Sequence, residues 1–143
     1  MSYGLAATGP MALLLLWCLR TRWAPIRRLV ELVEEQVGPR LAGTTPAGVV
    51  VLSLLAGVGE EALFRGLIQA GLDRYLPTWA AIATAALLFG MGHWLTRSYA
   101  LLAALIGGYL GLLFVIADNL LVPIVAHAAY DMVALSVLLR RVR

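Results

Sequence analysis

The chain has 143 residues, of which 62% are hydrophobic and 13% are charged, and its formal net charge is +3. Soluble domains average about 25% charged residues, so this composition, with a mean hydropathy of +0.88, excludes an ordinary soluble protein and indicates a polytopic membrane protein. The length predicts a single membrane domain over residues 1–143, and the one cysteine, Cys18, excludes an intrachain disulfide.

Five segments are predicted to cross a membrane as helices, because each offers close to the ~20 residues that the hydrocarbon core requires. The second and fifth qualify only if their internal charges face protein rather than lipid. The predicted fold class is therefore all-α, a polytopic transmembrane bundle. The five segments are residues 3–19, 46–72, 78–96, 98–117 and 119–139.

An amphipathic helix is predicted between the first two spans. Apolar residues recur there at helical spacing among charged ones, and Pro25 suits a first helical turn. This helix either lies at the membrane interface or is a short soluble helix that caps the bundle. The apolar residues are Ile26, Leu29, Val30, Val33 and Val37, and a turn-rich break is expected at residues 38–46.

The basic residues are all arginines, and they gather in loops beside the apolar segments, which favours topology signals over a nucleic-acid surface. If the five spans alternate, nine arginines fall on one side and only Arg74 on the other. The positive-inside rule then predicts an outside N-terminus and a cytoplasmic C-terminus. The nine are Arg20, Arg22, Arg27, Arg28, Arg40, Arg97, Arg140, Arg141 and Arg143.

Two adjacent glutamates and an arginine interrupt the second span. Residues four apart share a helix face, so Glu61 and Arg65 are predicted to form an ion pair, whereas Glu60 points about 100° away and lacks that partner. Charges in a membrane span are costly and mark functional sites. Glu60 is therefore the candidate general base, and Glu61 with Arg65 the structural pair.

Two later spans carry the chain's only histidines. His93 shares a face with Phe89, whose ring is expected to pack against the imidazole and orient it. His127 shares a face with Asp131, which could fix the histidine tautomer or join it in binding a metal. In the fourth span, Gly107 and Gly111 form a GxxxG motif that allows close helix approach.

Three motifs resemble those of the CAAX prenyl protease 2 and bacteriocin-processing (CPBP, or Abi) family of membrane proteases. Residues 60–65 (EEALFR) are similar to its EExxxR motif, and residues 89–93 (FGMGH) to its FxxxH motif. Residues 127–131 (HAAYD) are similar to its HxxxN motif, with Asp131 in place of asparagine. The three occur in the family's order, and the resemblance covers a core of residues 47–137.

The resemblance implies intramembrane hydrolysis of a peptide bond, with Glu60 and His93 activating water and with His127 and position 131 stabilising the oxyanion. An ionised aspartate cannot donate a hydrogen bond to an oxyanion. Asp131 is therefore protonated, or orients His127, or helps to bind a cation such as zinc, and the orienting role is favoured. A metal-free glutamate protease requires no cofactor, whereas a metalloprotease-like site would hold a divalent metal among Glu60, His93, His127 and Asp131.

The sequence thus predicts an intramembrane endopeptidase acting on a membrane-associated protein or peptide. One alternative is a non-catalytic bacteriocin self-immunity or membrane scaffold protein, and another is a proton or ion relay through the same polar residues. The expected partners are membrane lipid and the substrate, with no nucleic acid. The expected location is a prokaryotic cell membrane.

Overall fold

The computed structural model describes residues 2–142; Met1 and Arg143, the latter one of the predicted topology arginines, lie outside the described residues. The predicted all-α fold is confirmed, and the described residues contain no strand. The elements are α1 (Ser2–Arg20), α2 (Ala24–Leu41), α3 (Pro46–Glu61), the π-helical η1 (Ala62–Gln69), α4 (Ala70–Leu72), α5 (Thr78–Gly92), α6 (Arg97–Ala117) and α7 (Leu121–Arg141).

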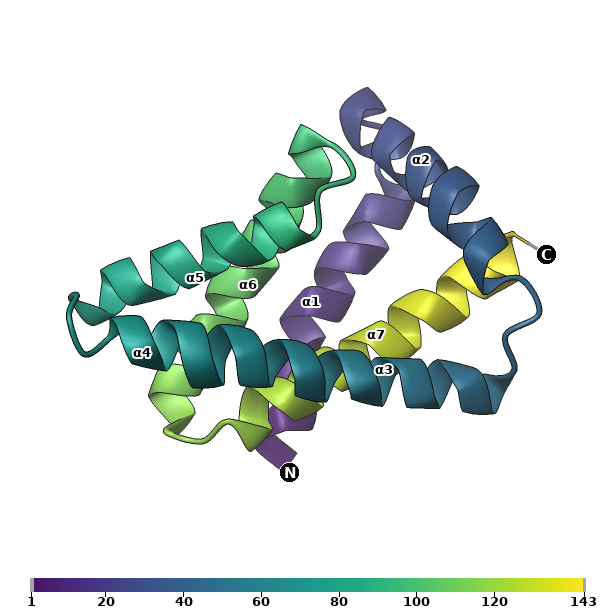
Figure 1. The fold of residues 1–143 in the computed structure, drawn as a ribbon. Coiled ribbons are helices and arrows are strands. Elements are labelled where there is room, and N and C mark those ends of the chain that lie inside the picture. The colour runs from purple at the N-terminus through teal and green to yellow at the C-terminus, as the bar shows by residue number, and fades with distance from the viewer. Residues whose placement is uncertain (1, 143) are drawn as a thin grey trace.

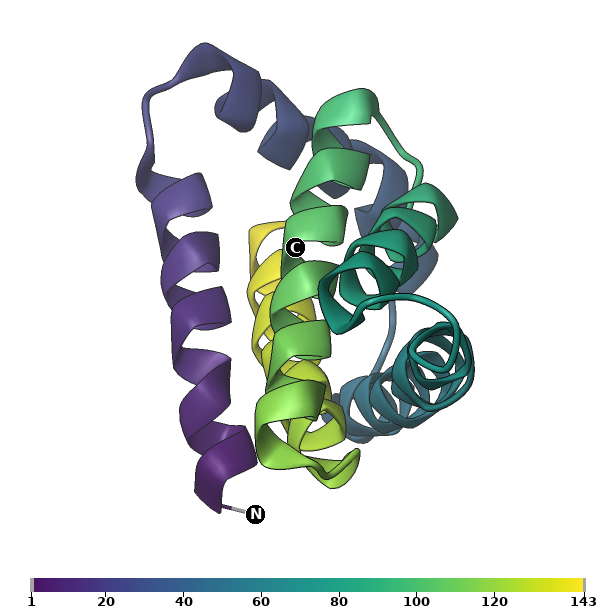
Figure 2. The same ribbon diagram turned by 90° about the vertical axis from the view of Figure 1, so that its left-hand side faces the viewer.

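The bundle has three main groups of helices, which are the α3–α5 segment, the α6–α7 pair, and α1 (Figure 1). The segments α3, η1 and α4 follow one another as a single rod, and α5 turns back beside it. α5 packs on α6, and α7 packs against both α3 and α1. The view in Figure 2 shows α1 on the opposite side of α6 and α7 from the α3–α5 pair. The α6 and α7 helices therefore form the middle of the molecule.

Four helices in the described chain are long and apolar enough to cross a membrane, one fewer than predicted. The exception is the predicted span 78–96, which is helical only over Thr78–Gly92, or 15 residues and about 22 Å. The helix ends at Gly92 because the backbone of His93 is no longer helical. Thr96 then caps the start of α6, where its side chain accepts a hydrogen bond from the Tyr99 N–H. His93 consequently lies at a helix end rather than inside a span.

The predicted amphipathic helix is present as α2 and includes Pro25 in its first turn. Leu29 is buried toward the bundle, whereas Arg27 and Glu31 form an ion pair on the exposed face. The helix runs through Pro39 to Leu41, although a break was expected from residue 38 onward. Pro39 is tolerated because it falls in the last turn, where a missing N–H interrupts little further helix.

Small residues allow the central helices to approach closely. The buried positions of α5 and α6 are mostly alanine and glycine, a composition that gives membrane helices close van der Waals contact. A Cβ at Gly90 would lie 2.5 Å from the Ala100 carbonyl oxygen and 2.8 Å from the Ala104 Cβ. Gly90 is therefore the point where α5 and α6 touch backbone to backbone.

Replacing this glycine is expected to destabilise the bundle. The variant Gly90→Ala should lower the free energy of unfolding by about 1–3 kcal/mol, because the backbone of α6 must move to admit the methyl group. Denaturant titration in detergent micelles measures the change. Gly9→Ala is the matched control, since a Cβ there meets nothing within 4 Å. Equal stability of the two variants would contradict the close contact at Gly90.

Candidate active site

The two glutamates lie where the rod changes its helical geometry. Glu60 and Glu61 end α3, and the π-helical η1 begins at Ala62. At its other end, the Ala70 N–H donates to the Arg65 carbonyl, a bond between residues five apart. π-Helical turns widen a helix and occur frequently at functional sites. The sequence pattern predicted an uninterrupted α-helix here and did not reveal the π-helical segment.

The predicted ion pair is present in the middle of the protein. The Arg65 Nη1 lies 3.0 Å from the Glu61 Oε1, and the two side chains are 1% and 0% exposed. The Arg65 Nη2 also donates to the Gly107 carbonyl of α6 at 2.5 Å, and its guanidinium lies 4.8 Å from the centre of the Phe89 ring. A buried charge needs such partners, and Arg65 finds them on three elements.

Glu61 also holds His127, a contact that the sequence did not predict. The His127 Nδ1 lies 2.7 Å from the same Oε1 that accepts from Arg65. A carboxylate paired with arginine is ionised and only accepts, so the His127 Nδ1 carries the proton and donates it to Glu61. Glu61, rather than Asp131, is therefore the carboxylate within hydrogen-bonding distance of the His127 ring.

The free edge of His127 faces two other carboxylates. Its Nε2 lies 4.0 Å from the Glu60 Oε2 and 3.6 Å from the Asp131 Oδ2. The separation from Asp131 is longer than a hydrogen bond. Asp131 thus stands on the cavity side of the imidazole, opposite Glu61.

His93 completes the cluster from the end of α5. Its Nδ1 lies 2.9 Å from the Phe89 carbonyl oxygen, which can only accept, so this nitrogen carries a proton and donates it. The ring also stacks on Phe89 with centroids 4.3 Å apart, the orienting contact expected from the sequence. The His93 Nε2 consequently points at the Glu60 Oε2, 3.4 Å away.

The four candidate catalytic residues and Phe89 share the wall of one cavity of about 110 Å³. This volume holds water easily, since one water needs about 10–15 Å³ measured in the same way. Apolar and tyrosine side chains from α6 and α7 complete the wall. The lining residues are Glu60, Phe89, His93, Tyr99, Leu102, Ala103, Ile106, His127, Tyr130 and Asp131.

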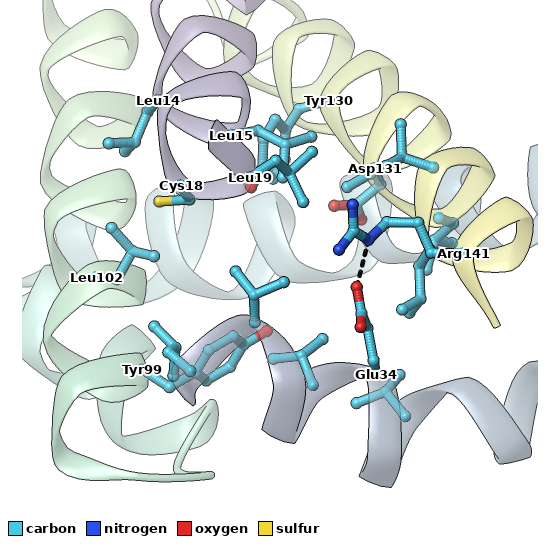
Figure 3. Close-up of a pocket in the computed structure, with 18 residues that line it drawn as sticks. Leu14, Leu15, Cys18, Leu19, Glu34, Tyr99, Leu102, Tyr130, Asp131 and Arg141 are labelled. Carbon is cyan, nitrogen blue, oxygen red and sulfur yellow. Dashed lines mark hydrogen bonds and ion pairs between the residues drawn. The ribbon is translucent and has the colours of Figure 1, made fainter. Parts of the chain in front are cut away.

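A second, larger cavity adjoins the first and is lined mainly by apolar side chains (Figure 3). It measures about 210 Å³ and lies between α1, α2, α6 and α7. Glu34 of α2 and Arg141 of α7 belong to its wall and form an ion pair, drawn dashed in Figure 3. The two cavities share four lining residues: Tyr99, Leu102, Tyr130 and Asp131.

A metal site requires three or more ligands that point at one position. Within residues 2–142, no three His, Cys, Asp or Glu side chains are grouped in that way. The four predicted ligands do line one cavity, but the His127 Nδ1 is already directed at Glu61 and the His93 Nδ1 at a carbonyl. One nitrogen of each histidine is left facing the cavity.

Comparison with protein families identifies a type II CAAX prenyl endopeptidase Rce1-like model that matches residues 42–133. The chain belongs to this Rce1-like family. The matched segment runs from the loop before α3 into α7 and contains all of the candidate catalytic residues. Searches of curated proteins and of solved structures found no match. Family membership and four apolar helices together make this a membrane protein of a protease family.

Proposed function

We propose that the protein is an intramembrane endopeptidase that hydrolyses a peptide bond by metal-free activation of water. The observation that carries the proposal is the position of the Glu60 carboxylate, which faces the Nε2 atoms of both histidines across one cavity. Glu60 is the general base, His93 the second acceptor for the water, and His127 the group that stabilises the oxyanion. The family match and this geometry support a CAAX prenyl protease 2-like activity as part of the proposal.

The first step needs a water held by two acceptors. With its Nδ1–H given to the Phe89 carbonyl, neutral His93 offers the Nε2 lone pair, and Glu60 offers a carboxylate oxygen 3.4 Å from it. A water that donates one proton to each is aligned to attack a carbonyl carbon placed in the cavity. As the oxygen–carbon bond forms, Glu60 takes the water proton, and it later gives that proton to the leaving amine.

Charge on the carbonyl oxygen needs a donor fixed in advance. A protonated His127 keeps its Nδ1–H on Glu61 and turns its Nε2–H toward the cavity. The Glu61–Arg65 pair is almost completely buried, so it holds the ring without reorganising during the reaction. Asp131 lies on the same side of the His127 ring as this Nε2–H donor. Its negative charge therefore opposes the developing charge of the oxyanion.

The direct test is proteolysis by the purified chain in lipid vesicles, with a pool of membrane peptides as substrate and mass spectrometry of the new termini. The proposal expects cleavage by the wild type and none by His93→Ala. Absence of cleavage by the wild type, together with a biological effect that survives in His93→Ala, would favour the scaffold or immunity function. Proton flux through the vesicles that depends on Glu60 would favour the relay.

Cleavage is expected to survive removal of metal. After dialysis against a chelator, the wild type should keep its kcat within about twofold, because the proposed base and oxyanion donor are side chains. Elemental analysis of the same sample should find well under one zinc per chain. One zinc per chain, with activity lost on chelation and restored by zinc, would replace this mechanism with the metalloprotease one.

Asp131→Asn is expected to raise kcat, by about tenfold, because an amide donates to the oxyanion where a carboxylate repels it. The change is nearly isosteric and leaves the Glu61–His127 bond in place, so stability should be unchanged. Steady-state kinetics of the wild type and of the Asp131→Asn and Asp131→Ala variants measure the effect. A lower kcat for Asp131→Asn would show that the negative charge of Asp131 serves the reaction.

The arginine distribution supports a cytoplasmic C-terminus as part of the proposal. Arg140 and Arg141 end α7, and α2 at the same end of the bundle carries Arg27 and Arg28. A reporter enzyme that is active only outside the cytoplasm, fused after the C-terminus, should be inactive. Activity of that fusion would reverse the orientation.

A further inference from the structure

Gln69 is a buried polar residue that the proposed reaction does not use. It is the last residue of η1 and only 2% exposed. Its Nε2 donates to the Gly111 carbonyl of α6 at 3.1 Å, and its Oε1 has no hydrogen-bond partner among the described residues. A buried polar atom without a hydrogen-bond partner lowers the stability of the folded state. The unpaired Gln69 Oε1 therefore destabilises the fold.

Gln69 repeats the contact that Arg65 makes one turn earlier. Arg65 donates to the Gly107 carbonyl and Gln69 to the Gly111 carbonyl, so side chains four residues apart on one helix bind carbonyls four residues apart on the other. The two bonds form a ladder of two rungs where the rod crosses α6 (Figure 1). A ladder of this kind fixes both the rotation and the register of η1 on α6.

The glycines of the GxxxG motif make room for this ladder. A Cβ at Gly111 would lie 2.6 Å from the Gln69 Oε1, and one at Gly107 would lie 3.2 Å from the Phe89 ring. The neighbouring Gly108 faces elsewhere, and a Cβ there would meet only Ala86, at an ordinary 3.8 Å. The motif predicts a close approach of helices, and its glycines admit the side chains of Gln69 and Phe89 from the neighbouring elements.

The register matters because a chain of contacts runs from it to the candidate oxyanion donor. Arg65 lies between Gly107 and Glu61, and Glu61 in turn binds His127. The π-helical segment from Ala62 to Gln69 has i→i+5 rather than i→i+4 bonding, and its Arg65 and Gln69 side chains bind it to α6. We propose that Gln69 is a positioning residue, which locks η1 on α6 in the register that lets Arg65 and Glu61 hold the His127 ring.

The variant Gln69→Met tests the ladder without opening a cavity. Methionine matches the length of glutamine but cannot donate, and Gly111 lies inside α6, so its carbonyl keeps its intrahelical bond. With two histidines in the chain, ¹⁵N-histidine spectra in micelles resolve His93 and His127 separately. We expect the His127 ring signals to shift and broaden while the His93 signals stay in place. Gln36→Met, at the exposed second glutamine, should change neither.

A second pair of variants acts from the other side of the contact. Gly111→Ala should displace the Gln69 amide and reproduce the His127 signature, whereas Gly108→Ala should leave the spectrum unchanged. If Gln69→Met does not fold, this pair decides. Unchanged His127 signals in a folded Gln69→Met or Gly111→Ala protein would overturn the positioning role.

The kinetic consequence rests on the proposed function. Gln69→Met should lower kcat at least fivefold with KM unchanged, since the oxyanion donor is misplaced but the substrate cavity is intact. An unchanged kcat would overturn the link to catalysis. A wild type without peptidase activity would end the proposed function, and the spectra would still test the ladder.

Discussion

Glu60→Gln is expected to lower kcat for peptide cleavage by about 10²–10⁴-fold and to leave the protein folded. Glutamine has the shape of glutamate but cannot take a proton from water. The Glu60 Oε2 has no hydrogen-bond partner among the described residues, and the side chain is 32% exposed. The substitution therefore removes the base without removing a bond that holds the bundle together, which separates a catalytic carboxylate from a structural one.

The measurement is single-turnover cleavage in vesicles, paired with thermal unfolding followed by circular dichroism. Glu35→Gln on α2 is the matched control, because it removes one carboxylate from an exposed position. We expect it to keep full activity. A Glu60→Gln protein that cleaves at the wild-type rate would remove Glu60 from the reaction.

Contacts between residues four apart in the sequence are predictable from spacing. Glu61 and Arg65 meet, and Phe89 stacks on His93, because residues four apart lie one above the other. The Glu61–Arg65 contact survives even though η1 is π-helical. The local rule needs only the sequence, and for that reason spacing alone predicts that Glu61, and not Glu60, pairs with Arg65.

The bond between Glu61 and His127 depends instead on how α3 packs against α7. A Cβ at Gly57 would lie 2.9 Å from the Ala128 Cβ and 3.0 Å from the Ala128 backbone nitrogen, so the two helices touch there. That approach carries His127 to Glu61, one turn beyond Gly57 on α3. No local pattern measures the distance between helices, and spacing alone therefore favours Asp131, the nearest carboxylate in the sequence, as the partner of His127.

Gln69 shows what a fuller use of spacing could have found. It follows Arg65 by four residues in an apolar run, so it shares the face of the buried ion pair. A polar side chain on that face needs a partner inside the protein. The sequence contained this signal, but the partner, a backbone carbonyl of α6, has no sequence signature.

The second large effect is expected from Arg65→Met, which should lower the free energy of unfolding by about 3–5 kcal/mol. Methionine fills the space, but the variant leaves the Glu61 carboxylate buried without its cation. The exposed pair Arg27–Glu31 has the same i,i+4 spacing, a separation of 3.5 Å and side chains 64% and 56% exposed. Arg27→Met should therefore cost less than about 1 kcal/mol. Denaturant titration in micelles compares the two variants.

A double-mutant cycle separates the lost pair from lost packing. Glu61→Gln removes the charge that Arg65→Met leaves alone, so the double variant should be clearly more stable than the sum of the two single effects predicts. Its kcat should nevertheless stay low, because a glutamine at position 61 does not hold His127 as an ionised carboxylate does. Additive losses of stability would mean that Arg65 acts through its bond to Gly107 rather than through Glu61. Stability would then come from the α6 contact, and the buried pair would serve only to hold the His127 ring.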